Sequence, residues 1–185
     1  MNKKKEKNLR SLMITDLESR LLPVFIDKGF WHVSLPPEEI SRDTKRGFPL
    51  GRLKRKSGTE LDIIEFQFEI HGEPQFVINF GTVPETGVTL PWGKHVIQNL
   101  VGANSLPISY RLHSSPVAWI LFGPYFGPNW FGPGFFSRKN KQAITRAVDK
   151  ALLLSGEVIN WFETKAIGKH VEICDGPGHS RDAKE

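Results

Sequence analysis

Four potential metal ligands lie close together near the C-terminal end of the chain. They are His170, Cys174, Asp175 and His179. Imidazole, thiolate and carboxylate groups all bind zinc, and a structural zinc site needs four of them in a tetrahedral arrangement. The same run also has the composition of an ordinary polar tail, and no two histidines of the chain form an HxxxH, HExxH or HxH pair. We therefore predict no metal site and no cofactor.

Residues that could carry acid–base or nucleophilic chemistry are present but scattered. His113 is followed by Ser114 and Ser115, and Asp62 and Glu65 lie together in an apolar stretch. The chain has no GxSxG turn, no P-loop and no GxGxxG turn, which are motifs that position a nucleophile or bind phosphate groups. No partner base is visible for the single cysteine. We predict no catalytic residue, and a small enzyme of unknown reaction is the third of three functional hypotheses.

Residues 123–136, which we call the aromatic loop, are rich in glycine, proline and aromatic residues. The pair Gly-Pro occurs three times in this loop. Its aromatic side chains have two interpretations. They either plug the edge of the hydrophobic core, where large aromatics are usually found, or they present anchors to a partner from a proline-stiffened loop. We predict a partner-binding site at four of them: Tyr125, Phe126, Trp130 and Phe131.

A basic stretch precedes an acidic one. Seven Lys and Arg residues between Arg42 and Lys56 accompany a single acidic residue, Asp43, whereas the next stretch, as far as Leu100, has six Asp and Glu residues and one Lys. A basic stretch next to an acidic one indicates either ion pairing between adjacent strands or a basic face for an anionic partner.

The basic residues also alternate along a predicted strand. A turn at Ser57-Gly58 would place Arg55 opposite Glu60, and we expect the strand face with the other basic side chains to be exposed to solvent. The predicted anion-binding residues on this face are Arg52, Lys54 and Lys56. Together with the basic arm Lys3–Lys7, they support a nucleic-acid-associated protein as the second hypothesis.

The scaffold for these residues is organised around a hairpin from Leu61 to Phe80. Apolar and polar residues alternate along both arms, which is typical of strands with one buried face. Opposed residues of antiparallel strands share a face, so the buried rows match if Phe68 pairs with Phe76 or with Ile78. Both alternatives keep an apolar residue opposite Phe68.

Helices flank this hairpin. Apolar spacing predicts a helix from Leu9 to Lys28 that Pro23 kinks or divides, and a second helix that starts near Arg138, with Ser137 as its N-cap, and ends at Gly156. The other predicted elements are a helical segment at Glu157–Ala166 and strands at Phe30–Val33, Leu50–Lys56, Ile108–Leu112 and Val117–Phe122.

These elements predict an α+β fold with an antiparallel meander sheet of about five or six strands, and helices from both ends of the chain on one face. That face should carry the buried row of the hairpin: Phe66, Phe68, Phe76 and Ile78. We expect a single domain over residues 9–174, a disordered basic arm at 1–8 and a flexible tail at 175–185.

Several short motifs follow one another in this order. They are Lys28-Gly29-Phe30, Ile63–Gln67, Phe76–Gly81 and Trp161-Phe162-Glu163. In this arrangement, from about Leu9 to Glu163, the chain resembles a widespread family of small bacterial cytosolic proteins catalogued as a domain of unknown function; it departs from the family at Leu35–Pro49 and in the aromatic loop. The resemblance implies the fold and no residue role, because the family has no agreed activity.

Composition limits the setting. A single cysteine, Cys174, excludes an internal disulfide and fits a reducing cytosol. No apolar run reaches the ~20 residues of a membrane span, and none follows the basic first residues as in a signal peptide. We expect a cytoplasmic protein without membrane contact. Our first hypothesis is a non-catalytic module that binds another protein through its sheet and aromatic loop.

Overall fold

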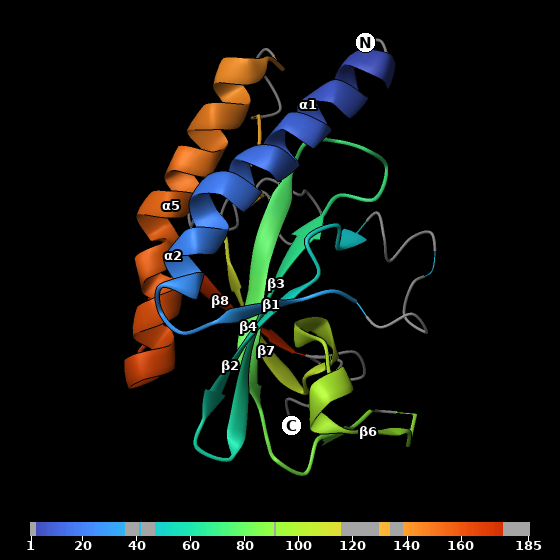
Figure 1. Cartoon of the computed structure of the whole chain (residues 1–185), viewed down its shortest axis with the longest axis vertical. Helices are drawn as coiled ribbons and strands as arrows, with labels where there is room; N and C mark the ends of the chain where they lie inside the picture. The colour runs from blue at the N-terminus through green and yellow to red at the C-terminus, as the bar shows by residue number, and fades with distance from the viewer. Residues whose placement is uncertain are drawn as a thin grey trace, which may run out of the picture.

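A six-stranded antiparallel sheet with helices packed on one face forms the fold (Figure 1). This computed structural model describes residues 3–35, 41, 47–90, 92–115, 130–133 and 139–175. In sheet order, the strands are β1 (Trp31–Val33), β2 (Arg52–Ser57), β3 (Glu60–Phe68), β4 (Phe76–Val83), β7 (Ile108–Leu112) and β8 (Val171–Asp175). The predicted α+β class and antiparallel sheet are confirmed.

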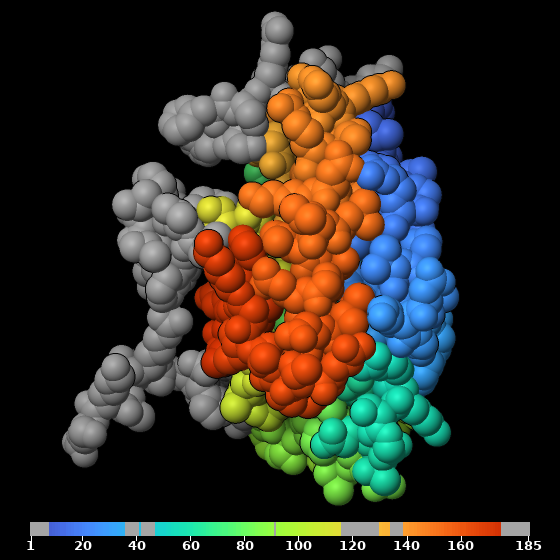
Figure 2. Space-filling view, turned by 90° about the vertical axis from the view of Figure 1, so that its left-hand side faces the viewer, coloured from blue at the N-terminus to red at the C-terminus, as the bar shows by residue number. Residues whose placement is uncertain are grey.

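The helical layer contains one N-terminal and one C-terminal unit. Its elements are α1 (Lys3–Asp16), a π-helical turn η1 (Leu17–Leu21), α2 (Leu22–Ile26) and α5 (Lys141–Thr164). The blue N-terminal unit and the orange α5 lie side by side over the sheet (Figure 2). Arg20 of η1 joins them, because its guanidinium forms ion pairs with Asp16 and with Asp149 of α5.

The N-terminal helix begins earlier than expected. It starts at Lys3 and not at Leu9, so residues 3–8 of the predicted disordered arm are helical. Pro23, which was expected to kink or divide this helix, lies in the first turn of α2, immediately after the π turn. Proline lacks a backbone N–H, and its ring collides with the preceding helical turn. The π turn, which is wider than an α-helical turn, occupies the residues just before Pro23.

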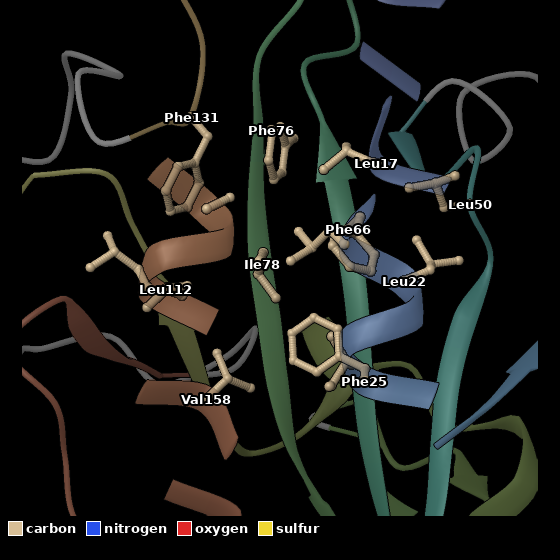
Figure 3. Packing of buried hydrophobic residues seen from close by; sticks show 14 of the residues in the cluster. Leu17, Leu22, Phe25, Leu50, Phe66, Phe76, Ile78, Leu112, Phe131 and Val158 are labelled. Carbon is tan, nitrogen blue, oxygen red and sulfur yellow. The ribbon is translucent and has the colours of Figure 1, made fainter. Parts of the chain in front are cut away.

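The central hairpin pairs Phe68 with Phe76, the first of the two predicted registers. The row of Ile64, Phe66 and Phe68 therefore faces the helices and is buried there. Figure 3 shows Phe66 of this row close to Phe25 of α2, and Val158 of α5 pointing toward the sheet. The helices cover the predicted face.

The β2–β3 turn differs from the prediction by one residue. Ser57 pairs with Glu60, so Gly58 and Thr59 form the turn, and Arg55 lies opposite Asp62 rather than Glu60. Gly58 has a φ of 63°, a conformation that glycine adopts without strain and that tight hairpin turns require. The predicted turn put glycine at the second position of the turn, whereas the backbone needs it at the first.

Helix α5 is one continuous element. Gly156 was expected to end it, but the helix runs through this position to Thr164. Glycine in a helix interior costs about 1 kcal/mol relative to alanine, and the buried stripe continues beyond it with Val158, Ile159 and Phe162. The burial of that second half therefore outweighs the local cost. The expected start near Arg138 and the cap at Ser137 lie outside the described residues.

Asn140 is the N-cap of α5. Its side-chain oxygen accepts a hydrogen bond from the backbone N–H of Ala143 at 2.9 Å. We expect Asn140→Ala to lower the free energy of unfolding by about 1 kcal/mol, because one N–H of the first turn loses its acceptor. Urea unfolding would measure this, with Asn140→Asp as the matched control that keeps an acceptor oxygen. Equal losses in the two variants would contradict the capping role.

The last described strand was not predicted. β8 adds a sixth strand next to β7, with Tyr110 opposite Ile173 and Leu112 opposite Val171. Val171 is buried against the helices, and Ile173 is about half exposed. β8 extends one residue into the predicted tail 175–185, since Asp175 still belongs to the strand. The predicted strand at Val117–Phe122 lies outside the described residues.

Candidate functional site

The second face of the sheet is covered by residues 84–90 and 92–107, which we call the lobe. It contains a small two-stranded sheet, β5 (Val88–Thr89) with β6 (His95–Val96), and the 3-10 turns η3 (Gln98–Leu100) and η4 (Ala103–Ser105). In Figure 1 the lobe lies beside the lower part of the sheet, away from the helices. It forms a second hydrophobic cluster with the sheet: Leu61, Ile63, Val83, Val88, Leu90, Val101, Ala103 and Leu106. Both faces of the hairpin are therefore buried there.

The lobe covers the basic residues that the sequence placed on a solvent face. Arg52, Lys54 and Lys56 do share one face, but Arg52 is only 6% exposed and Lys54 only 5%. The guanidinium Nε of Arg52 lies 2.6 Å from a carboxylate oxygen of Glu65. This corrects the predicted anion-binding face: its first two cations are buried, and only Lys56 is exposed.

Buried charges hold the lobe backbone. The second carboxylate oxygen of Glu65 accepts a hydrogen bond from the N–H of Ala103 at 2.9 Å. Arg52 also donates to the carbonyl of Leu100, and Lys54 donates to that of Asn99. Because buried charges cost free energy unless they are paired and hydrogen-bonded, these contacts restrict the lobe to one position on the sheet.

Gly102 makes this close approach sterically feasible. A Cβ atom at this position would lie 2.8 Å from a guanidinium nitrogen of Arg52 and 2.9 Å from a carboxylate oxygen of Glu65. Any side chain there would collide with the ion pair. Glycine therefore lets the lobe backbone pack directly on the charged pair.

Three large apolar side chains of the lobe are exposed. Trp92 is 66% exposed in the tip of the β5–β6 hairpin, and Ile97 is 59% exposed just before η3. Leu100 at the end of η3 is also exposed. Trp31 of β1 is opposite Lys54 and so lies on the same face of the sheet, and its side chain is 43% exposed. We call Trp31, Trp92, Ile97 and Leu100 the lobe surface.

The aromatic stretch divides between core and surface. Phe131 is fully buried, and its ring stacks on that of Phe76 at a centroid distance of 5.2 Å. Its backbone also forms two hydrogen bonds with Phe76. Phe131 thus extends the core as a plug, which corrects its predicted role as a partner contact. Trp130 is half-buried, and Tyr125 and Phe126 lie outside the described residues.

The scattered histidines and carboxylates do not assemble a metal site. Within the described parts of the chain, no three His, Cys, Asp or Glu side chains lie close enough to hold a metal ion. His170 contacts Glu157, Cys174 lies in β8 opposite Ser109, and His179 is outside the described residues. Ser114 donates its hydroxyl hydrogen to the carbonyl of Trp130, a contact that does not activate it as a nucleophile.

Comparison with protein-family models, with curated proteins and with solved structures finds no match for this chain. Among the described residues, no helix has both the length and the apolar composition needed to cross a membrane. The functional argument therefore rests on the geometry of the sheet and the lobe.

The lobe surface was not predicted, because the sequence analysis placed no candidate binding residue in this part of the chain. One signal was available. The run Pro91-Trp92-Gly93 places a tryptophan in a tight turn, where a large side chain has few neighbours. Glycine at position 93 has a φ of 81°, and the turn it permits holds Trp92 away from the core.

Proposed function

We propose that this protein is a non-catalytic module that binds another protein through the lobe surface. The observation that carries the proposal is the exposure of Trp92 and Ile97 on a segment whose backbone is held by buried charges. A single exposed apolar residue is ordinary on a protein surface. Four large ones are exposed on the lobe and on β1, two of them tryptophans, and tryptophan is enriched at protein-binding hot spots.

The lobe is held in one position before binding, and this favours tight association with a partner. Association loses free energy when loops and side chains become ordered, and a pre-ordered surface reduces this loss. The Arg52–Glu65 pair and the hydrogen bond from Ala103 order the lobe before any partner arrives. The lobe surface thus replaces the aromatic loop as the main proposed contact, with half-buried Trp130 as a secondary one.

The alternative of nucleic-acid binding has less support. Arg52 and Lys54 are already engaged with groups of the protein itself, and phosphate contacts need cations that can reach the nucleic-acid backbone. The proposed setting is the cytoplasm, because a chain with one cysteine forms no internal disulfide, as is usual for proteins of reducing compartments.

Affinity purification from the native host tests the proposal. We expect a partner that co-purifies with the wild type and is lost with the double variant Trp92→Ser/Ile97→Ser. Each truncation of a hot-spot residue should weaken binding by about 2 kcal/mol, which is roughly a thirtyfold change in Kd. The melting temperature should stay close to wild type, because both side chains are mostly exposed.

Leu153→Ser is the matched control. Leu153 is 81% exposed but belongs to α5 on the opposite side of the sheet, so its loss should leave the partner bound. A photo-crosslinking residue at position 97 should capture the partner, whereas the same residue at position 153 should not. Retention of every partner by the lobe variant, or crosslinking at 153 alone, would refute the proposal.

A further inference from the structure

A histidine is buried where the sheet meets the C-terminal half of α5. His113 directly follows β7 and is only 6% exposed. Its Nδ1 atom has no hydrogen-bond partner in the part of the chain that the structure describes. Its backbone N–H donates to the carbonyl of His170 at 3.0 Å, which extends the β7–β8 pairing by one step beyond Leu112 and Val171.

A carboxylate on α5 clasps the start of β8. One oxygen of Glu157 lies 2.7 Å from Nδ1 of His170, and the other accepts from the backbone N–H of His170 at 2.8 Å. The chain packs tightly here, since a Cβ atom on Gly168 would lie 2.2 Å from Glu157 Oε2. Edge strand β8 is thus tied both to β7 and to the helix at the same point.

The surroundings of His113 together lower its pKa. Burial is the main cause that lowers the pKa of His113, and the neighbouring imidazole of His170, with a ring centroid 6.3 Å away, acts in the same direction. Arg111 also lowers it, whereas Glu157 and the backbone of Ser115 raise it. The adjoining residues 116–129 contain no Lys, Arg, Asp, Glu or His.

We propose that His113 and the Glu157–His170 clasp form an acid-sensitive latch on edge strand β8. In mildly acidic solution His113 can become protonated. The charged imidazole is stabilised by solvent, and the closed structure excludes solvent from it. The turn 165–170 and β8 then separate from β7, and the imidazole of His113 becomes accessible to solvent. The opened form exposes the backbone edge of β7, which can pair with another extended segment.

The direction of the pH effect follows from the buried site. In the opened form His113 has an ordinary pKa of about 6.5, and in the closed form its pKa is lower. The closed form therefore binds fewer protons. It is fully stable above about pH 6.5 and loses stability as the pH falls from there toward the lower, closed-state pKa.

Hydrogen exchange of the full chain between pH 7.5 and pH 5.0 tests the latch. Protection factors, corrected for the intrinsic exchange rate, should fall for amides of Val171–Asp175 by up to about tenfold per pH unit below pH 6.5, the limit for one linked proton. The β3–β4 hairpin should keep its protection. In His113→Leu, which keeps a buried apolar side chain, β8 should lose this pH dependence.

A second measurement does not need a variant. Titration of the wild-type histidines by NMR should give His113 a midpoint below about 6.5, with the signals of β8 changing over the same pH range. A midpoint at or above that value would overturn the latch. So would unchanged protection of β8 at pH 5.0, or an equal fall in protection in the His113→Leu variant.

Discussion

Phe68→Ala should lower the free energy of unfolding by about 3–5 kcal/mol. Phe68 is fully buried on the helix-covered face, and its ring lies 5.7 Å from that of Phe76. The guanidinium of Arg10 packs over the other side at 4.9 Å from the ring centroid. Truncation removes these contacts and leaves a cavity between the sheet and α1. Guanidinium chloride unfolding at equilibrium would measure the loss.

Ile70→Ala is the control for this prediction. Ile70 continues the alternation of β3 but lies past the end of the strand and is 48% exposed. Its truncation should cost no more than about 1 kcal/mol. If Phe68→Ala unfolds at nearly the same denaturant concentration as Ile70→Ala, the hairpin is not the centre of the core.

Arg52→Met should also lower the free energy of unfolding by about 3–5 kcal/mol, because it leaves the Glu65 carboxylate buried without its cation. The Arg52 and Glu65 side chains are only 7% and 3% exposed. Removal of the cation should also loosen the lobe, since Arg52 holds the carbonyl of Leu100. Urea unfolding together with hydrogen exchange of residues 97–105 would follow both effects.

The double variant Arg52→Met/Glu65→Leu separates the charge from the packing. With both charges removed, stability should recover most of the loss, because apolar replacement of a buried ion pair is often neutral. Lys56→Met, the exposed neighbour on the same strand face, should change stability by no more than about 0.5 kcal/mol. A double variant as unstable as Arg52→Met would show that the guanidinium acts through packing and not through its charge.

The hairpin could be predicted because the pattern that determines it lies within its own two strands. Alternating apolar residues fixed which row is buried, and the requirement that Phe68 meet an apolar residue left two registers, one of which is observed. The exposure of Arg52 could not be predicted in the same way. It depends on the lobe, which reaches the second face from more than thirty residues further along the chain, as the contact with Ala103 through Glu65 shows.

Two other errors have the same origin. Val171–Asp175 continues directly into a polar tail, and its pairing with β7 is long-range in sequence. Gly156 carries a local stop signal that the packing of Val158 and Phe162 overrides. In the candidate site, the sequence could not distinguish a buried aromatic residue from an exposed one. The stacking of Phe131 on Phe76 shows that Phe131 belongs to the core.

The π turn of the N-terminal helix keeps the apolar side chains of this helix on one side. Leu9, Met13, Leu17 and Leu21 are spaced by four residues, so their side chains drift around an α-helix that has 3.6 residues per turn. The wider turn at Leu17–Leu21 reverses this drift before Phe25 meets the sheet. Loss of one residue there would rotate the upstream half by about 100° relative to Phe25. The segment therefore tolerates changes of exposed side chains such as Glu18 and Ser19 far better than changes of its length.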